Sequence, residues 1–465
     1  MKPILRWLGW ATFAMVIRMR LYQLLSQIYA SCIGEVSTDG AIQRSTGKGD
    51  GDKPTALVLS YEQFRGDIED LAATGQVRIL CLKEHWLTRL MFQFYPEGVG
   101  LAKHVPYFNP TQQDVTWAPK QQYRAFLKQF LPRLFDRLGV DILISHHVHC
   151  RQDFDWGAVS DELGYPYLVI NRENLFVSEY IRNLAHRRIS RLGQFEGRYV
   201  TVHNKVAEQV ISGSGYVSKN HIHVLGCIRM DRFLKRLKTF GRPSQEKPAI
   251  TFFTYLTRAG RGEDYGPKAQ CSSVHRLLAE IAHENPAIEV IFKVKPTFYN
   301  TWKRMFDEAT ANFPVAVDQL DNLHISTTLP AHDLIERSNV IIGFNSTTVL
   351  EASIADRHVI VPYFGPWQEE RYSEHVYLPD KMHLFNVPSD IEDMKRMIFK
   401  CLKSQKVDNT FLAERRSLFE EYVSPLDGSA TAKHIQLIKT IYQEHRVVQQ
   451  SVSTKRTLYD GVPGS

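Results

Sequence analysis

The chain has 465 residues, of which 43% are hydrophobic and 23% are charged, and its formal net charge at pH 7 is +7. This composition is that of an ordinary soluble globular protein, and the length suits two domains with additional segments. The acidic residues are interspersed among the basic ones, which argues against a nucleic-acid-binding protein. The six cysteines are far apart in the sequence, which argues against a disulfide framework and fits a protein of the reducing cytoplasm.

The N-terminal segment, residues 1–36, is apolar and basic. Residues 7–17 carry no charge, and Lys2, Arg6, Arg18 and Arg20 flank them. This apolar run is too short to span a bilayer, which needs about 20 residues, and no signal-peptide cleavage site follows it. Two interpretations are open. The segment is either an interfacial helix that places the protein peripherally at the inner face of the cell membrane, or a helix packed on the protein itself.

The next part of the chain predicts a linker and then a first domain. Residues 37–54 are polar and rich in Gly, Ser and Asp, which predicts a flexible linker. Within residues 55–240, short apolar runs alternate with helical patterns. We expect strands at 56–60, 77–82, 142–145, 167–170, 200–202 and 224–226, and a long amphipathic helix at 121–138 that Pro132 kinks or splits. Such nearly continuous apolar strands predict a parallel sheet covered on both faces.

A second domain is expected over residues 249–446. Residues 240–248 contain Gly, two prolines and charge, which makes them the best boundary between domains. The alternation then restarts, with strands expected at 250–254, 289–293, 324–326, 340–343 and 358–362, and residues 447–465 form a frayed tail. The sequence therefore predicts an α/β fold with two facing Rossmann-like domains, each a doubly wound parallel sheet, and C-terminal helices that cross back to the first domain.

One segment of the second domain has the pattern of a ligand site. Residues 340–362, VIIGFNSTTVLEASIADRHVIVP, predict a strand, a turn containing Asn345, a helix and a strand. A helix start offers unpaired N–H groups and a positive dipole end, to which Ser346 and Thr347 add hydroxyl groups. In doubly wound folds, ligands bind where strands end. We therefore predict an anionic, nucleotide-linked ligand here, with Asn345 among its contacts, although Ser346 could merely cap the helix.

Glu351 lies five residues after Ser346, inside the same expected helix. Its carboxylate could accept two hydrogen bonds from a ribose diol. The alternative is an exposed helix glutamate paired with Arg357.

The segment resembles a known family. NSTTVLEA, followed by a short turn and HVIVPYF, is similar to the nucleotide-binding half of GT-B glycosyltransferases. The resemblance is greatest to the bacterial capsule polysaccharide and CDP-glycerol glycerophosphotransferase type. It implies that Ser346 and Thr347 contact the phosphates of a nucleotide-activated donor and that Glu351 contacts its ribose.

Three further segments resemble the same family. VIFKVKP, residues 290–296, is similar to a strand ending in K-P-H-P, with Lys295 in place of the histidine, so Lys293 and Lys295 are expected to neutralise phosphate. VLGCIRMD is similar to a V-x-G-x-x-R-x-D turn, in which Arg229 either reaches a diphosphate or, with Asp231, serves in turn and capping contacts. FEEYVSPLDGSATAKHI, residues 419–435, resembles the closing segment. Residues 56–220 match only in their strand–helix rhythm.

The general base is expected in the first domain. Acceptor activation needs a group that titrates near neutral pH, and His146 and His147 directly follow a predicted strand. Glu173, after the next strand, is the competing candidate, and its alternative role is a salt bridge with Arg172 or Arg182.

The same segment, SHHVHC, raises the question of a metal. His146, His147 and His149 with Cys150 are adjacent ligands without a distant Cys/His cluster, which is a poor zinc signature. We therefore expect no metal.

The resemblance implies a transferase that moves a sugar or polyol phosphate from a UDP-, CMP-, CDP- or GDP-linked donor to a glycan or lipid-linked acceptor in surface-polysaccharide synthesis. No cofactor is required, and no nucleic acid takes part. Two alternatives remain open: a sugar-nucleotide epimerase on the same fold, and a non-catalytic nucleotide-sugar-binding protein that keeps the pocket and lacks the base.

Overall fold

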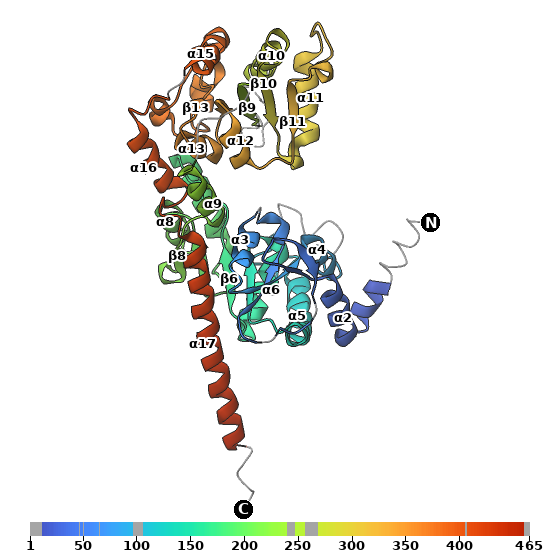
Figure 1. Cartoon of the computed structure of the whole chain (residues 1–465). Helices are drawn as coiled ribbons and strands as arrows, with labels where there is room; N and C mark the ends of the chain where they lie inside the picture. Colours follow the sequence, from blue (N-terminus) through green and yellow to red (C-terminus); the bar gives the residue numbers. More distant parts are fainter. Residues whose placement is uncertain are drawn as a thin grey trace, which may run out of the picture. The chain divides into compact units, whose positions relative to one another are not determined.

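The computed structural model describes residues 12–459 except 46, 50, 65, 96–105, 240–246, 256–267 and 405–406. The chain divides into two compact units, each coloured in more than one part of the spectrum in Figure 1. The first domain comprises Met1–Asn174, Ala185–Asp231 and Asp427–Ser465, and the second domain comprises Leu175–Leu184 and Arg232–Leu426.

The first domain is built on an eight-stranded sheet in the order β2-β1-β4-β3-β5-β6-β7-β8. Six of these strands are parallel: β3 (Thr55–Leu59), β4 (Arg78–Leu82), β5 (Ile142–Ser145), β6 (Tyr167–Ile170), β7 (Tyr199–Val202) and β8 (Ile222–Val224). At one edge β1 (Gly34–Val36) and β2 (Ile42–Arg44) are antiparallel. Every residue of β3, β4, β5 and β6 is buried, as the continuous apolar runs predicted.

Helices from both ends of the chain cover this sheet. They are α2 (Tyr22–Cys32), α3 (Asp67–Ala73), α4 (Glu84–Met91), α5 (Trp117–Leu138), α6 (Arg151–Glu162), α8 (Lys205–Gly213) and α17 (Ala430–Tyr459). Two more, α7 (Glu179–Ile189) and α9 (Ile228–Leu237), contribute residues to both domains. Ile438 and Ile441 of α17 are fully buried in one cluster with Val58 and Ile144. The last helix is therefore part of the core of the first domain.

The described part of the N-terminal segment packs on the first domain. Residues 12–18 are helical and α2 follows them. Phe13 and Tyr29 are buried, and the Tyr29 hydroxyl donates to the Trp86 carbonyl at 2.9 Å. The opposite side leaves apolar side chains exposed at Met15, Met19, Leu21 and Leu24. Residues 1–11, with Lys2 and Arg6, lie outside the described residues. Among the helices that the structure describes, none is both long enough and apolar enough to cross a membrane.

Two segments predicted to be flexible contain secondary structure. Within residues 37–54, β2 pairs with β1, and the buried Arg78 guanidinium donates to the Glu35 carboxylate and the Gly47 carbonyl, each at 2.7 Å. These contacts hold the predicted linker against the sheet. The predicted tail is helical as far as Tyr459, because α17 continues through it, and residues 460–465 lie outside the described residues. Pro132, which was predicted to kink or split its helix, lies inside the single helix α5, so the helix is not split.

The second domain is built on a five-stranded parallel sheet in the order β11-β10-β9-β12-β13. Its strands are β9 (Ala249–Phe253), β10 (Glu289–Lys293), β11 (Leu323–Ser326), β12 (Val340–Gly343) and β13 (His358–Ile360). Its other helices are α10 (Lys268–Glu284), α11 (Tyr299–Thr310), α12 (Ala331–Arg337), α13 (Thr347–Ser353), α14 (Glu370–Ser373), α15 (Ile391–Lys403) and α16 (Leu412–Tyr422). The α/β class is therefore the one predicted; the second sheet is wholly parallel, and the first is parallel except for β1 and β2.

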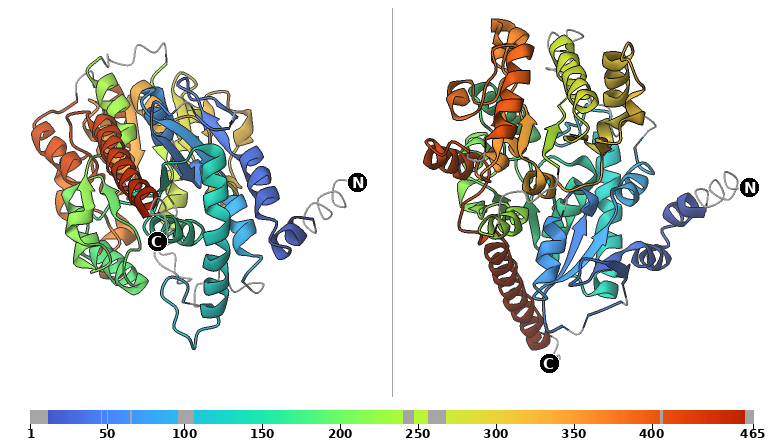
Figure 2. Two further views of the ribbon diagram at one scale, coloured as in Figure 1. Left: turned by 90° about the horizontal axis from the view of Figure 1, so that it is seen from below. Right: turned by 45° about the horizontal axis from the view of Figure 1, so that its top comes forward.

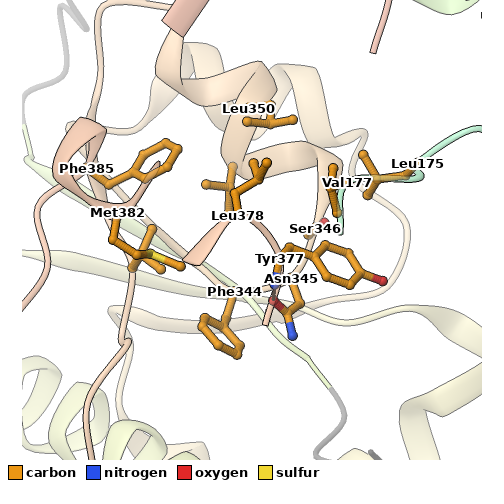
Figure 3. Close-up of a pocket in the computed structure, with 12 residues that line it drawn as sticks. Leu175, Val177, Phe344, Asn345, Ser346, Leu350, Tyr377, Leu378, Met382 and Phe385 are labelled. Atoms are coloured by element: carbon orange, nitrogen blue, oxygen red, sulfur yellow. Dashed lines mark hydrogen bonds between the residues drawn. The ribbon is translucent and has the colours of Figure 1, made fainter. Parts of the chain in front are cut away.

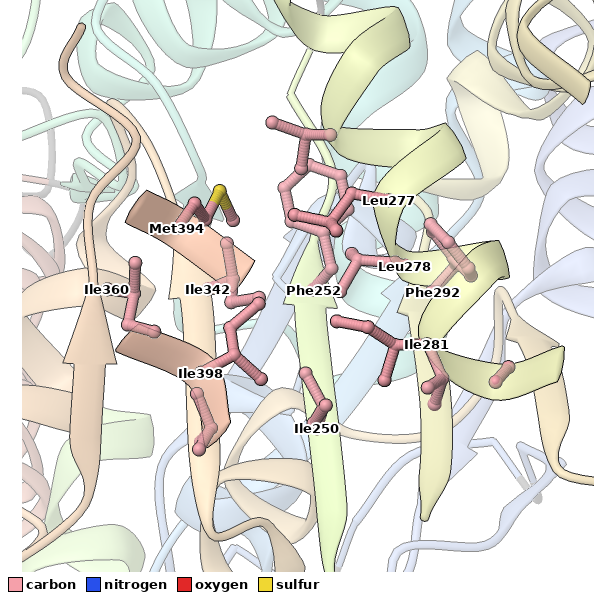
Figure 4. Packing of buried hydrophobic residues seen from close by; sticks show 14 of the residues in the cluster. Ile250, Phe252, Leu277, Leu278, Ile281, Phe292, Ile342, Ile360, Met394 and Ile398 are labelled. Carbon is pink, nitrogen blue, oxygen red and sulfur yellow. The ribbon is translucent and has the colours of Figure 1, made fainter. Parts of the chain in front are cut away.

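One face of this sheet is covered by α10, α11 and α15, which lie side by side in Figure 2. Figure 4 shows how they pack: Leu278 and Ile281 of α10 lie over Phe252, while Ile398 of α15 lies near Ile342. The strands contribute buried apolar residues at alternating positions, so this face forms the core of the domain.

The domain boundaries differ from the expected ones. Residues 427–446 belong to the first domain, because α17 packs into its core, and the chain passes into the second domain after Asp231. The expected boundary at 240–248 falls largely on residues 240–246, which lie outside the described residues.

A buried histidine in this core predicts sensitivity to acid. The His275 ring lies flat against Phe292, its Nδ1 is 2.6 Å from the Cys271 carbonyl, and its Nε2 accepts a hydrogen bond from the Trp302 indole at 2.8 Å. Burial lowers the pKa of His275 from 6.5 to about 4. The native state thus holds this ring neutral while the unfolded chain can protonate it.

Lowering the pH from 7 to 4 should therefore destabilise the protein through His275. The neutral His275 ring makes its full contribution to the free energy of unfolding above pH 6.5, and this contribution is lost as the pH falls toward 4. For a pKa shift of this size the loss is about 3 kcal/mol. The measurement is urea denaturation at several pH values, on the native chain and on His275→Gln, which has no titrating ring. The two should differ in the slope of stability against pH. Parallel slopes between pH 6.5 and 4 would contradict the assignment.

Candidate functional site

The predicted ligand segment forms the end of β12, a turn and the start of α13. Ser346 is the N-cap residue of α13, and its Oγ accepts from the Thr348 N–H at 3.3 Å. The Thr348 hydroxyl lies 2.9 Å from the same oxygen. Thr347 is the first residue of the helix, and both Ser346 and Thr347 are partly exposed. The capping contact exists, and the hydroxyl group of Thr347 stays accessible at the helix start.

Asn345 fixes the turn rather than pointing its amide at a ligand. Its φ of +50° lies in the left-handed region, which asparagine tolerates better than most residues. Its amide donates to the His375 carbonyl at 2.9 Å and accepts from the Tyr377 N–H at 2.8 Å. Asn345 was predicted as a ligand contact, and the structure shows it holding the segment around Tyr377 against the start of α13. Leu378, next in that segment, also has a positive φ, of 58°.

A pocket opens beside this turn (Figure 3). Tyr377, Asn345 and Ser346 provide its polar atoms. The rest of its lining is apolar: Leu175, Val177, Phe344, Val349, Leu350, Val361, Leu378, Met382 and Phe385. All of these residues belong to the second domain.

Glu351 is buried, with 3% of its surface exposed, so the alternative of an exposed helix glutamate is wrong. Its Oε2 lies 3.1 Å from Nε2 of His332, a residue of α12. The His332 ring in turn stacks on Phe233, with ring centroids 4.2 Å apart. Arg357, the expected partner of Glu351, instead donates to the carbonyls of Ile335 and Glu336. Nothing in the sequence indicates the Glu351–His332 pair, because its two residues lie on separate helices.

The two lysines at the end of β10 have different surroundings. Lys293 is half-buried, and its ammonium donates to the Thr327 carbonyl at 2.9 Å. Burial lowers the pKa of Lys293. Lys295 is exposed. Both stand at the carboxyl end of the sheet, where the sequence predicted phosphate contacts.

Arg229 and Asp231 make contacts within the first domain. The Arg229 N–H donates to Asp67 at 3.0 Å, and its guanidinium lies 3.8 Å from the same carboxylate. Asp231 accepts from the N–H groups of Ala430 and Thr431 at 3.1 and 2.7 Å, which caps the long helix α17. These contacts are those of the second alternative, turn and capping chemistry. The diphosphate role of Arg229 gains no support from them.

Polar side chains gather at the carboxyl end of the first sheet. Arg172, after β6, donates to Asp67 at 3.0 Å, so its observed partner is Asp67 rather than Glu173. Glu173 is exposed at the same edge. The buried polar residues here are Ser60, Asp67, Asn171, Asn174, His203 and Asn204. An edge of parallel strands that carries so many buried polar groups is where this type of domain binds ligands.

The histidines after β5 have separate surroundings. His147 Nδ1 accepts from the His149 N–H at 3.2 Å, and burial lowers the pKa of His147 well below its usual value. His146 Nδ1 lies 3.3 Å from Asp153, a fully buried residue of α6 whose other oxygen accepts from the Ser60 hydroxyl at 2.7 Å. A lowered pKa keeps the His147 imidazole neutral, which is the form that a base requires, so His146, His147 and Glu173 all remain candidate bases. Sequence reasoning missed Asp153, because nothing marks a helical aspartate as the neighbour of a strand-end histidine.

No family model matches the sequence, and no curated protein matches it. Similar solved structures include a putative UDP-N-acetylglucosamine 2-epimerase from Listeria monocytogenes, at 13% identity and a TM-score of 0.46, covering 84% of this chain and 97% of that one. The UDP-GlcNAc 2-epimerase of Neisseria meningitidis bound to UDP-GlcNAc has 11% identity and a TM-score of 0.45, covering 83% and 99%.

The wall teichoic acid polymerase TagF has 12% identity and a TM-score of 0.43, covering 67% of this chain and 75% of that one. The strands and helices of this chain form two α/β domains, each built on a mainly or wholly parallel sheet, and the final helix belongs to the first domain.

Proposed function

We propose that the chain is a transferase that moves a sugar or polyol phosphate from a nucleotide-activated donor to a surface-polysaccharide acceptor. The second domain binds the donor, a UDP-, CMP-, CDP- or GDP-linked compound. The first domain activates a hydroxyl group of the glycan or lipid-linked acceptor.

One observation on the second sheet carries this proposal. Lys293 of β10 and Gly343 of β12 are both register partners of Phe253, the last residue of β9. The end of β10 and the turn into α13 therefore lie on either side of one strand end. Lysine charge and the N–H groups of the helix start are thus brought to the same edge, where they can stabilise the charge that develops on the phosphate of the leaving nucleotide.

The first domain supplies the base. A base must be able to reach an acceptor hydroxyl, and it must stand where ligands bind. His146 and Glu173 follow neighbouring strands of the sheet, β5 and β6, and so lie at the same edge. We propose that one of them removes the proton of the acceptor.

Nucleotides should raise the melting temperature of the protein, because a ligand that binds only the native state stabilises it by mass action. A panel of CMP, CDP, UDP, GDP and ADP at about 100 times the dissociation constant should add about 2.7 kcal/mol for the nucleotide that matches the donor. The measurement is a thermal-shift series. No shift with any nucleotide would overturn the donor site.

A matched pair of lysine variants tests where the phosphate groups of the nucleotide bind. Lys295→Ala should reduce the shift, because it removes a charge at the end of β10. Lys303→Ala, on α11 and paired with Asp307, should leave it unchanged. Equal shifts in both variants would contradict the role of Lys295.

Product analysis separates the transferase from its two alternatives. With donor alone, an epimerase converts the sugar nucleotide to its isomer, and a non-catalytic binding protein leaves it intact. The transferase releases nucleotide only when acceptor is present.

A further inference from the structure

Three potential metal ligands lie together at the carboxyl end of β5. His146 follows the strand, Cys150 precedes α6, and Asp153 lies in the first turn of that helix. One nitrogen, one sulfur and one oxygen from these residues all lie within 4.8 Å of one another. Within the described part of the chain, these are the three His, Cys, Asp or Glu side chains that lie close enough together to hold one ion.

The geometry of this cluster differs from that of an ordinary ion pair. His146 Nδ1 and Asp153 Oδ2 are 3.3 Å apart, yet both atoms are buried and neither makes a hydrogen bond with a described residue. A histidine–aspartate pair normally satisfies both atoms by directing the N–H at the oxygen. Two ligands at about 2.0–2.1 Å from a tetrahedral metal ion are about 3.3 Å apart. The two atoms are therefore spaced as ligands of a shared ion.

We propose that His146, Cys150 and Asp153 bind a divalent cation of the Zn²⁺ class. Imidazole, thiolate and carboxylate are the three ligand types that zinc accepts, and a thiolate disfavours Mg²⁺ and Ca²⁺. Three protein ligands leave a fourth position for water or another ligand. The spacing H-x3-C-x2-D spans a short loop and one helical turn, which is why the histidines alone gave a poor zinc signature.

The surroundings hold the carboxylate in place. The Ser60 hydroxyl donates to Asp153 Oδ1 at 2.7 Å, and Asp153 is fully buried. Ser60 itself sits at a positive φ of 48° directly after β3, so its side chain is fixed by the end of a central strand. Such outer contacts orient ligands and strengthen metal binding.

A metal at this site would also affect which residue acts as the general base, and this point rests on the proposed function. When Nδ1 of an imidazole binds a metal ion, its lone pair can no longer accept a proton. His146 then acts as a metal ligand, and Glu173 is left as the base. Metal binding itself is measured without substrate, so it fails or succeeds independently of the transferase proposal.

The test is a titration of the full-length, untagged protein with Co²⁺ and Zn²⁺. We expect one equivalent of Co²⁺ to bind, with the visible bands of a tetrahedral ion and a sulfur-to-cobalt charge-transfer band, and Zn²⁺ to displace it. Asp153→Asn and His146→Gln should weaken binding by more than about 100-fold, and Ser60→Ala by about 10- to 100-fold. Cys150→Ser should abolish the charge-transfer band.

Two control variants replace a histidine and a cysteine that lie outside the cluster. His149→Gln removes a neighbouring imidazole, and Cys32→Ser removes another partly exposed thiol. Both should leave the stoichiometry and the spectrum unchanged. Circular dichroism of each variant separates lost binding from lost folding. Absence of a one-to-one complex in the native chain, or a charge-transfer band that survives Cys150→Ser, would overturn the proposal.

Discussion

Replacing Glu173 by Gln should lower acceptor-dependent turnover by about 10²- to 10⁴-fold, the usual contribution of a general base. Glutamine keeps the size and hydrogen-bonding shape of the side chain but cannot take the proton. Glu173 is exposed at the carboxyl end of β6, so its loss should leave folding intact. The measurement is the rate of nucleotide release with donor and acceptor present.

Two control measurements show whether the lost turnover comes from the missing base. Glu179→Gln, an exposed carboxylate in the first turn of α7, should keep native turnover. The nucleotide-induced thermal shift should persist in Glu173→Gln, because the donor binds in the second domain. If Glu173→Gln turns over at the native rate, Glu173 is not the base. If His146→Gln loses turnover while Glu173→Gln keeps it, His146 is the base instead.

The second large effect concerns stability. Asp155 is fully buried in the first domain, and its Oδ1 lies 2.9 Å from the Lys120 ammonium and 2.7 Å from Arg124 Nε. Its Oδ2 accepts from the Tyr107 hydroxyl at 2.8 Å. Burial by itself would raise the pKa of Asp155, but the charges of Lys120 and Arg124 outweigh it and hold this pKa below its usual value.

Asp155→Asn should destabilise the first domain by about 3–5 kcal/mol, because it leaves buried positive charge without its counter-ion. Urea denaturation followed by circular dichroism measures the loss. Glu196→Gln removes the more exposed partner of Arg124 and should cost less than about 1 kcal/mol. Lys120→Met in the Asp155→Asn background should recover part of the stability, since it removes the orphaned charge. Equal effects from Asp155→Asn and Glu196→Gln would contradict this account.

Local patterns predicted the parallel strands of the two sheets, because a buried parallel strand is a continuous apolar run that needs no distant information, but they did not predict the antiparallel strands β1 and β2. Residues 340–343 form β12 at the predicted position, and Ser346 caps the predicted helix, which begins at Thr347. The same reasoning misjudged residues 37–54 and 447–459, where composition is polar. Arg78 orders the first of these by a contact with Gly47, 31 positions away, and such a contact leaves no mark on composition.

The candidate site was only partly predictable, for the same reason. Motif residues at strand ends, such as Lys293 and Ser346, are visible in the sequence. The roles of Arg229 and Asp231 depend on Asp67 and on the start of α17, which lie 162 and 199 positions away. Whether a strand-end arginine meets a ligand or a carboxylate of its own domain is decided by packing at that distance.

The capping of α17 by Asp231 has a consequence for synthesis on the ribosome. The first domain needs Ile438 and Ile441 in its core, so it stays incomplete until the C-terminal residues leave the exit tunnel. Apart from one short segment, the second domain lies in a single stretch, Arg232–Leu426, between the parts of the first. It can therefore complete its core while the first domain still awaits its final helix. A nascent chain stopped at residue 426 would carry a domain with an unfilled face.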